Sequence, residues 1–548
     1  MKRDLESLAG RRFDVIVVGG GIIGAGIARD AAMRGLDTLL LEKEDFGYGA
    51  TSRSSRLIHG GLRYLRRLEL SLVRQDLHER ETLLRIAPHL VRPLPFLIPV
   101  KGGALWQRAT LGPGLALYDI LSYDKSLPSH RYLSREETLE IEPGLELKDL
   151  AGAFLYYDCQ APFPERLCLE NVLSAVRHGA SAANHARAIG MVRDGGDVAG
   201  VHVQDELSGQ TYQVGARIVV NAAGHWVDSL WQGLTGGRRP SVRRTKGVHL
   251  LTSQLSHNAI VLFARADGRL FFVLPWEGHS LIGTTDTDYS GDLDAIHADT
   301  ADVEYLMSEA RYAFPDVRLE AVHYAMAGLR PLADSGARRT GDLSRAHRLV
   351  DHQRADGIGG VISVVGGKIT AYRAVAQEAV ALACRKLGHK VRCTTADSPL
   401  PGAPAVSRED AERIASESGL SVETTTHLAD LYGSRATEVA DLVKQDARGG
   451  QPLCPHGRDV LAQVWHAVAE EGARTVSDFL LRRSALGLQP CQGLDAAETV
   501  AGEMGRLLGW SAEESLMAGV DAYSAQAALC QRFRQTLPAT DSLLLPQS

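Results

Sequence analysis

Three glycines of the stretch "GGGIIG" have the spacing of a dinucleotide-binding turn. Gly19, Gly21 and Gly24 fit G-x-G-x-x-G directly after an apolar run that ends at Val18. The first glycine allows a tight turn, the second lets the backbone approach a pyrophosphate, and the third packs a helix on a strand. Glu42 follows 18 residues after Gly24, where a carboxylate accepts hydrogen bonds from a ribose. These residues predict a dinucleotide site.

Two later glycine-rich turns indicate which dinucleotide binds. "IVVNAAGHWVD" spans residues 218–228 and "VISVVGGKITAYR" spans residues 361–373, and each is typical of a strand, a turn and a helix start. Backbone N–H groups at such a helix start stabilise the negative charge of a reduced flavin. A nicotinamide enzyme is not expected to spread its site from Gly19 to Lys368. The sequence therefore favours FAD, which we expect to be bound non-covalently.

The elements that must position these residues follow from local patterns. Residues 13–45 predict a strand, a helix and a second strand, because a continuous apolar run precedes the glycine turn. Residues 259–276 contain two β-rich runs around Asp267-Gly268, which predicts a hairpin in a separate antiparallel layer. Residues 394–410 contain three prolines and predict a linker. From about residue 405 the pattern is helical.

Composition excludes several function classes. The 548 residues have a net charge of −6, which argues against general nucleic-acid binding. No apolar run reaches the 18 or so residues of a membrane span, and the N-terminus has no secretory signal. No two cysteines form C-x-x-C, so a metal cluster with that spacing is not expected. Free thiols in a reducing cytosol are predicted for Cys159, Cys168, Cys384, Cys393, Cys454, Cys491 and Cys530.

The stretch "GATSRSSRLIHGGLRYL", residues 49–65, resembles the FAD-dependent glycerol-3-phosphate dehydrogenases, which have the D-amino-acid-oxidase-like flavoprotein fold. "NAAGHWVD", "TKGVHLL", "FFVLPW", "IGTTDTDY", "GLRPL" and "SVVGGKITAYR" follow in the family's order. The resemblance covers about residues 12–400, and more loosely the C-terminus through "DFLLRR". One departure is "QAPFPERL", residues 160–167, where the family usually has two acidic residues.

The resemblance implies a fold of three parts. The first is a Rossmann-like α/β domain for FAD, expected from residues 12–95, 150–240 and 325–395. An antiparallel β-sheet domain that binds the substrate is expected from residues 96–149 and 241–324. A helical domain is expected from residues 405–537.

The resemblance also implies a reaction. The family oxidises sn-glycerol 3-phosphate to dihydroxyacetone phosphate, moving a hydride from C2 to flavin N5, and passes electrons to membrane quinone. An oxidase that uses O2, an amine or amino-acid oxidase, and a non-catalytic flavin-binding protein stay open as alternatives. We expect a cytoplasmic enzyme on the inner face of the cell membrane, with residues 104–125 or 478–488 at the lipid surface. A homodimer is a candidate assembly.

By similarity to the family, cations line the substrate pocket because the substrate has a phosphate. The expected residues are Arg63, Tyr64, Arg330, Arg345 and Lys368. His249 is the candidate base for the C2 hydroxyl. Alternatively, Lys368 or Arg330 stabilises the alkoxide and water takes the proton. The expected cofactor-binding residues are Gly19, Gly21, Gly24, Glu42, Lys43, Thr51, Ser52, Ser55, His59, Gly60, Gly61, Leu62, Ala223, Gly224, Gly366, Gly367, Lys368 and Thr370.

Overall fold

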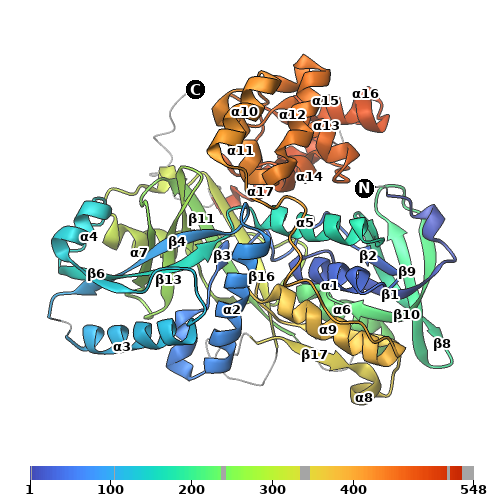
Figure 1. Cartoon of the computed structure of the whole chain (residues 1–548), viewed down its shortest axis with the longest axis horizontal. Coiled ribbons are helices and arrows are strands. Elements are labelled where there is room, and N and C mark those ends of the chain that lie inside the picture. Colours follow the sequence, from blue (N-terminus) through green and yellow to red (C-terminus); the bar gives the residue numbers. More distant parts are fainter. Residues whose placement is uncertain (2, 104, 236–241, 334–345, 515–518, 534–548) are drawn as a thin grey trace.

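The computed structural model describes residues 1, 3–103, 105–235, 242–333, 346–514 and 519–533. Two β-sheets lie side by side, and a group of helices formed by the C-terminal residues covers one edge of both (Figure 1). No helix within the described residues is both long and apolar enough to cross a membrane.

The first sheet is built on parallel strands. Its order is β17 (Arg348–Asp351), β18 (Val361–Val365), β10 (Thr211–Asn221), β1 (Arg12–Val18), β2 (Thr38–Leu41) and β7 (Ser181–Ala183). β1 pairs in parallel with β10 and β2, and β10 pairs in parallel with β18. The apolar run of β1 is buried from Phe13 onward except for Asp14, as expected for a strand covered on both faces. β8 (Ala186–Asp194) and β9 (Asp197–Asp205) extend the sheet beyond β10.

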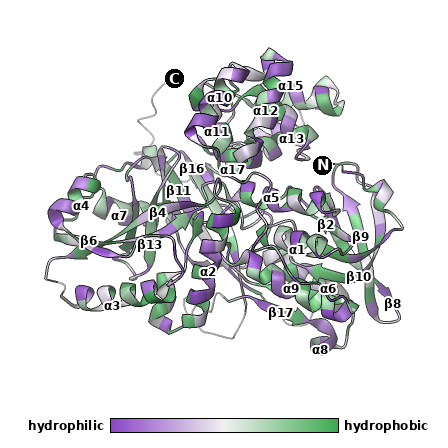
Figure 2. Ribbon diagram, viewed as in Figure 1, coloured by the Kyte–Doolittle hydropathy of each residue, from purple (hydrophilic) through white to green (hydrophobic). Residues whose placement is uncertain are grey.

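Three helices cover one face of this sheet. α1 (Ile22–Met33) packs against α5 (Pro164–Arg177) and α9 (Tyr372–Leu387). The small residues of α1 allow this close approach, since a Cβ at Gly26 would lie 2.9 Å from the Tyr372 ring. The predicted strand, turn, helix and strand over residues 13–45 are thereby confirmed. Figure 2 shows α1 as predominantly hydrophobic.

The second sheet is largely antiparallel. Its order is β15 (Thr287–Asp288), β11 (Val242–Ser253), β14 (His279–Gly283), β13 (Leu270–Trp276), β12 (Ala259–Phe263), β4 (Arg92–Lys101), β6 (Leu150–Gln160) and β3 (Leu57–Ile58). β16 (Tyr324–Ala333) also pairs with β11, and β5 (Arg131–Ser134) pairs with β6. The predicted hairpin is confirmed, because β12 and β13 are antiparallel neighbours joined through Asp267-Gly268. α4 (Arg135–Ile141) and α7 (Thr300–Ala313) lie beside this sheet (Figure 1).

The sheets divide the chain differently from the predicted segments. β6 and β16 belong to the second sheet, although residues 150–240 and 325–395 were expected in the FAD-binding domain. The reason is that a strand's sheet is decided by its pairing partner, and β6 pairs with β4 over almost its whole length. The expected three-domain division itself stays a prediction.

The C-terminal residues form helices, as predicted. They include α10 (Arg408–Ser418), α11 (Val422–Tyr432), α12 (Ala436–Gln445), α13 (Leu461–Ala469), α15 (Ala497–Leu508) and α17 (Ala522–Leu529). Ser407 caps α10, since its hydroxyl accepts a hydrogen bond from the Asp410 N–H at 3.1 Å. These helices alternate hydrophobic and hydrophilic residues (Figure 2), and residues 388–407 form no helix or strand.

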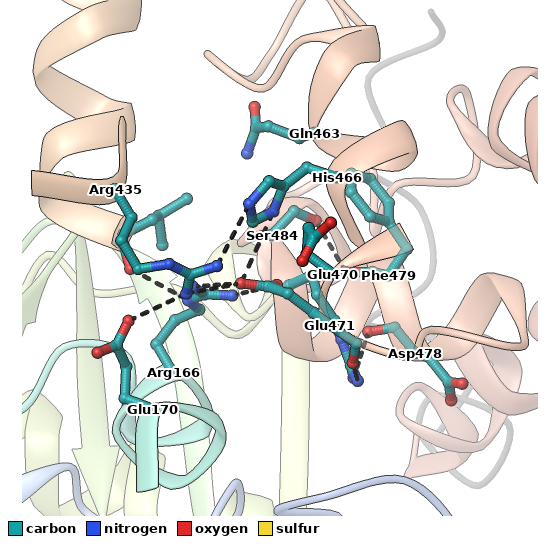
Figure 3. Close-up of polar contacts among 12 residues, drawn as sticks. Arg166, Glu170, Arg435, Gln463, His466, Glu470, Glu471, Asp478, Phe479 and Ser484 are labelled. Carbon is teal, nitrogen blue, oxygen red and sulfur yellow. Dashed lines mark hydrogen bonds and ion pairs between the residues drawn. The ribbon is translucent and has the colours of Figure 1, made fainter. Parts of the chain in front are cut away.

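A buried ion network fastens these helices to α5 (Figure 3). Arg166 on α5 makes a bidentate pair with Glu471, at 2.6 and 2.8 Å. Arg435 reaches both Glu170 and Glu471 at 3.4 Å, and His466 lies within 3.8 Å of Glu471. Each of these side chains is almost fully buried. Breaking a buried pair leaves an uncompensated charge, so the network fixes how the C-terminal helices dock.

The unusual stretch 160–167 has a structural explanation. Besides Arg166, it supplies Glu165, which pairs with Arg56 at 2.8 Å. The carbonyl oxygen of Pro162 accepts hydrogen bonds from Arg56 at 2.6 Å and from the Trp276 indole at 2.8 Å. The stretch therefore ties the two sheets and the C-terminal helices together.

Candidate functional site

One large cavity lies between the two sheets, at the carboxyl ends of the parallel strands β1 and β10. It has a volume of about 800 Å³, and residues of both sheets line it, from Val18 and Ala222 to Gly247 and Gly328. Ligands of doubly wound α/β sheets bind at this edge. The cavity is therefore the candidate site.

The glycine turn between β1 and α1 opens into this cavity. Gly19 has φ of +106°, and a Cβ there would stand 2.6 Å from the Ala222 carbonyl oxygen. Gly21 is the N-cap residue of α1, and it lines the cavity. Because the first residues of α1, Ile22 and Ile23, also line this space, the helix start offers partial positive charge to a phosphate.

The predicted acidic residue is in the expected place. Glu42 directly follows β2 and lines the cavity. Its carboxylate accepts hydrogen bonds from the N–H groups of Gly20 at 2.7 Å and Glu44 at 2.9 Å. Burial raises the pKa of Glu42, and these two hydrogen bonds oppose that rise. A carboxylate has about four acceptor positions, so it retains capacity for a ribose hydroxyl.

Side chains of the following loop close this end of the cavity. Thr51 Oγ1 accepts a hydrogen bond from the Ile22 N–H at 3.0 Å. Lys43 pairs with Asp294, and its Nζ lies 3.9 Å from the centroid of the Trp226 ring. All of these residues line the cavity.

The other two glycine turns meet at the same cavity. Gly366 and Gly367 follow β18 with φ of +76° and +110°, a backbone conformation that glycine adopts readily. Thr370 Oγ1 accepts a hydrogen bond from the His59 N–H at 3.1 Å, which joins this turn to the loop around residue 60. The predicted residues of these two turns and of the loop around residue 60 that line the cavity are His59, Gly61, Leu62, Ala223, Gly224, Gly366, Gly367, Lys368 and Thr370.

Two of the predicted cations line the cavity, and each has an acidic partner. Arg330 on β16 contacts Asp286 at 3.1 Å, Thr284 Oγ1 at 2.7 Å and the Thr285 carbonyl oxygen at 3.0 Å. Lys368 pairs with Asp76, and its Nζ lies 4.1 Å from the centroid of the Tyr64 ring. Burial raises the pKa of Asp76 to about 6, against the opposing effect of Lys368.

His249 also lies on the cavity wall. It is 3% exposed, and its Nε2 lies 2.8 Å from Ser55 Oγ. Burial, followed by the charges of Arg330 and Arg56, lowers the pKa of His249 to about 3. The imidazole is therefore neutral near pH 7, as a proton acceptor must be.

These residues fit FAD. The glycine cradle, the start of α1 and Glu42 line one cavity together with the turn of Gly366 and Gly367, and the first three are the elements that a dinucleotide site requires. His225 Nε2 and His249 Nδ1 are buried and find no hydrogen-bond partner among the described residues, although both residues line the cavity. Buried polar atoms without partners are uncommon, and a polar ligand is an expected partner for them.

Several predicted residues are not part of the cavity wall. Gly24 packs α1 onto the turn, since a Cβ there would lie 1.8 Å from the Gly19 carbonyl oxygen. Gly60 is enclosed by Leu77 and Tyr118. The Ser52 hydroxyl donates to the Tyr48 carbonyl oxygen at 3.0 Å. Arg345 and the side chain of Arg63 lie outside the described residues.

Sequence reasoning missed several polar and aromatic residues of the cavity wall as site residues. Arg53, His225 and Trp226 are three of them. Arg53 places its guanidinium 4.5 Å from the centroid of the Tyr48 ring and hydrogen-bonds the Tyr48 carbonyl oxygen. All three stand inside the quoted motifs "GATSRSSR" and "NAAGHWVD", so the motifs themselves were the available signal.

Residues 14–373 match the family described as FAD dependent oxidoreductase, and residues 393–515 match the C-terminal domain of alpha-glycerophosphate oxidase. The chain is 38% identical over 534 residues to a glycerol-3-phosphate dehydrogenase of Synechocystis sp., covering 93% of this chain and 96% of the relative. It is 36% identical over 519 residues to glycerol-3-phosphate dehydrogenase 2 of Mycobacterium tuberculosis, covering 93% and 87%.

Solved structures have the same architecture. The glycerol-3-phosphate dehydrogenase from Bacillus halodurans, complexed with FAD, matches with a TM-score of 0.77 at 29% identity, covering 96% of each chain. The glycine oxidase from Geobacillus kaustophilus matches with a TM-score of 0.53 at 21% identity, covering 71% of this chain and 98% of its own. The second likeness shows the fold alone.

Proposed function

This chain belongs to the FAD-dependent oxidoreductases, and within them to the glycerol-3-phosphate dehydrogenases, and from this premise we propose that it oxidises the C2 hydroxyl of sn-glycerol 3-phosphate to a ketone. The observation that supports this substrate most directly is the joining of a glycine cradle, Arg330, Lys368 and His249 in one cavity. The cradle serves a dinucleotide, the cations serve a phosphate, and the neutral imidazole serves an alcohol proton.

When bound, FAD supplies a two-electron acceptor for oxidation of the alcohol carbon. Gly19, Gly21 and Glu42 would hold its adenosine and pyrophosphate portion. The turn of Gly366 and Gly367 would hold the ring portion, where backbone N–H groups favour negative charge. FAD is non-covalent in this proposal.

Arg330 and Lys368 bind and orient the substrate in this proposal. Arginine binds a phosphate through two parallel hydrogen bonds, whereas lysine acts as a point charge. Hydrogen bonds from Arg330 to Thr284 and Thr285 fix its guanidinium before the substrate arrives. We assign Arg345 and Arg63 to the same phosphate on sequence similarity.

His249 accepts the proton of the C2 hydroxyl at Nε2 in this proposal. Nε2 is the ring nitrogen that already meets a cavity-lining hydroxyl, that of Ser55 at 2.8 Å. The low pKa keeps the imidazole deprotonated before the substrate binds, and the negative charge of a bound phosphate would raise that pKa and favour proton uptake.

The substrate assignment is tested by comparing alcohols and amines under one assay. The purified holoenzyme is supplied with an artificial electron-accepting dye, and reduction of the dye is measured with sn-glycerol 3-phosphate, glycerol and glycine. We expect turnover with sn-glycerol 3-phosphate only. Turnover of glycine would support the amino-acid oxidase hypothesis. Turnover of glycerol as fast as that of sn-glycerol 3-phosphate would refute the phosphate-binding role of the cations.

For the electron acceptor we propose a membrane quinone. Two observations motivate this. The relative from Staphylococcus saprophyticus, 32% identical over 532 residues, is named an aerobic glycerol-3-phosphate dehydrogenase, and apolar side chains are exposed on α3 (Leu105–Leu121) and in the segments that flank it. The match of residues 393–515 to a domain named after an oxidase favours O2 as the second candidate. Oxygen consumption in the absence of quinone separates the two, since a quinone-linked enzyme consumes little.

The apolar surface beside α3 is the proposed membrane contact. α3, η2 (Leu62–Arg67) and the start of α2 (Leu70–Ile86) pack together at the lower edge of the molecule in Figure 1. Leu68, Ile120 and Tyr123 are 78%, 67% and 78% exposed. The Arg74 guanidinium lies 4.3 Å from the centroid of the Tyr123 ring. Apolar and aromatic side chains with adjacent cations are typical of interfacial surfaces.

The other expected membrane segment does not have this character. Within residues 478–488, Phe479, Leu480 and Leu486 are fully buried in the core of the C-terminal helices. The apolar run "DFLLRR" is therefore a core segment, and the proposal for the membrane rests on α3 and its neighbours. A homodimer stays a prediction.

A further inference from the structure

Two cysteines and an aspartate of the C-terminal helical region lie together, far from the cavity in sequence. Cys454 Sγ is 3.6 Å from Cys491 Sγ, and the Cys454 thiol donates a hydrogen bond to Asp495 Oδ2 at 3.0 Å. One ligand atom from each residue lies within 4.8 Å of the others. Within the described residues, this is the one group of three or more such side chains that meets this distance.

Backbone N–H groups point at both sulfur atoms. The His456 N–H donates to Cys454 Sγ at 3.3 Å, and the Gly493 N–H donates to Cys491 Sγ. Each donor lies two residues after its cysteine. Ligand atoms of metal sites are characteristically held by such outer hydrogen bonds. The two turns therefore present both sulfurs in the same way.

The separation of the sulfurs matches a shared metal ion. With zinc–sulfur bonds of about 2.3 Å, two sulfurs 3.6 Å apart subtend an angle of about 103° at the metal, close to the tetrahedral value. A disulfide needs a sulfur separation of about 2.05 Å. The pair is thus placed for a bridging ion without movement of the backbone.

Burial is graded across the cluster. Cys454 is buried in the core of the C-terminal helices, Cys491 is half-buried, and Asp495 is exposed. A metal ion held by the three would be reached from the side of Asp495. The fourth tetrahedral position would face solvent and hold water.

We propose that Cys454, Cys491 and Asp495 form a binding site for one soft divalent cation of the Zn²⁺ class. Binding displaces the two thiol protons to solvent, and forms two metal–sulfur bonds and one metal–oxygen bond, with no change in oxidation state. The ion would join the turn before α13 to the segment before α15, and so clamp the C-terminal core.

The proposal is tested on the full-length holoenzyme. The protein is reduced, stripped with a chelator, incubated with excess Zn²⁺ and desalted, and its zinc content is measured by elemental analysis. X-ray absorption at the zinc edge then reports the ligands. We expect one zinc ion per chain, with two sulfur atoms at about 2.3 Å.

Three variants test which residues bind the zinc ion. Cys491→Ser should lose the zinc, and Asp495→Asn should bind it at least 10-fold more weakly, the size seen when a site loses a supporting contact. Cys393→Ser is the matched control, because its thiol is half-buried and lies outside the cluster, and it should keep one zinc ion. Flavin content and the thermal midpoint of the stripped proteins show that each variant has folded.

Two results would overturn the proposal. One is a wild-type protein that retains less than about a tenth of a zinc ion per chain under these conditions. The other is equal zinc content in the wild type and in folded Cys491→Ser. Asp495 is exposed, so its variant keeps the test informative if the cysteine variant does not fold.

Discussion

Arg330 is held in position by Asp286, Thr284 and Thr285 at the wall of the cavity. If Arg330 binds the phosphate as proposed, its replacement by alanine removes a charge-assisted hydrogen bond, an interaction of about 1.5–3 kcal/mol. We expect Arg330→Ala to lower kcat/KM for sn-glycerol 3-phosphate by about 100-fold, with flavin content unchanged. Steady-state assays and flavin absorbance measure both.

Arg265→Ala is the control for this variant. Arg265 follows β12 in the second sheet, is about half exposed and pairs with Glu309 at 3.5 Å, and it does not line the cavity. Unchanged kcat/KM is expected for it. If Arg330→Ala retained wild-type kcat/KM, the phosphate would bind elsewhere.

His249 allows a prediction about both rate and pH. Loss of a general base costs about 10²–10⁴-fold in rate, so His249→Gln should lower kcat by that range while flavin content persists. The active form is the neutral imidazole, and its pKa is lowered to about 3. Activity should therefore not fall through a midpoint near 6.5 as the pH drops from 8 to 5.

The pH profile of kcat/KM checks this, because that parameter reports the free enzyme. An acidic limb with a midpoint near 6.5, present in the wild type and absent from His249→Gln, would contradict the burial argument. If His249→Gln had the kcat of the wild type, His249 would not be the base, and the alternative in which water takes the proton would be supported.

The turn between β1 and α1 depends on close packing of glycines. A Cβ at residue 24 would lie 1.8 Å from the Gly19 carbonyl oxygen, so Gly24→Ala must displace α1 from the turn. We expect at least a 10-fold loss of FAD affinity and destabilisation of about 1–3 kcal/mol. Flavin retention after gel filtration and the thermal midpoint measure these changes.

Gly502→Ala is the matched helical control. Nothing lies within 4 Å of a Cβ at this position of α15, and alanine is favoured over glycine in a helix by up to about 1 kcal/mol. This variant should keep its flavin and become slightly more stable. Full flavin retention in Gly24→Ala would contradict the assigned packing role.

The docking of the C-terminal helices should weaken at low pH. Burial raises the pKa of Glu471, but Arg166, His466 and Arg435 outweigh it and hold that pKa well below its usual range. Because the pKa of Glu471 is lower in the folded protein than in the unfolded chain, its ionised carboxylate stabilises the fold. This stabilisation is complete above the pKa of the unfolded chain, about 4.5, and is lost as the pH falls toward the pKa of the folded protein. Glu471→Gln should therefore be less stable than the wild type by about 3–5 kcal/mol at pH 7.

Denaturant unfolding at pH 7, 5 and 3.5 measures this difference. It should be equal at pH 7 and 5, and smaller at pH 3.5, because the wild-type carboxylate begins to take up protons in the unfolded state. A difference that grew as the pH fell would refute the ion-pair assignment.

The sequence predicted those parts of the site that depend on nearby residues. Gly19, Gly21 and Glu42 were found because the turn, the strand and the acid follow one another closely along the chain. The pairing of Lys368 with Asp76 joins residues 292 positions apart, and no local pattern encodes it. The same holds for Cys454 and Cys491, which are 37 positions apart and escape a search for C-x-x-C.

The local sequence of a strand also could not predict which of the two sheets the strand joins. β6 directly precedes the strands β7 to β10 of the first sheet in the chain, β16 precedes β17 and β18, and the apolar patterns of β6 and β16 suit either sheet. Their membership of the second sheet depends on pairing with β4 and β11. Arg53 is a similar case at the cavity, because its place on the wall depends on how its loop lies against Gly328.

The whole molecule should bind lipid through the surface beside α3. We expect Leu68→Asp with Ile120→Asp to lower binding to anionic liposomes by at least 10-fold, since apolar burial at the interface is lost and negative charge is added. Leu207→Asp is the control, because Leu207 is 49% exposed and lies outside this surface. Sedimentation with liposomes measures binding, and dye-linked turnover confirms an intact active site. Equal sedimentation of the double variant and the control would place the membrane contact elsewhere.

The central claim is that one cavity brings FAD and sn-glycerol 3-phosphate together. Its most direct test is to add sn-glycerol 3-phosphate to the purified yellow protein without oxygen and to follow the absorbance of oxidised flavin. We predict rapid and complete bleaching with this substrate and none with glycerol. A protein that contains flavin but does not bleach with sn-glycerol 3-phosphate would contradict the claim.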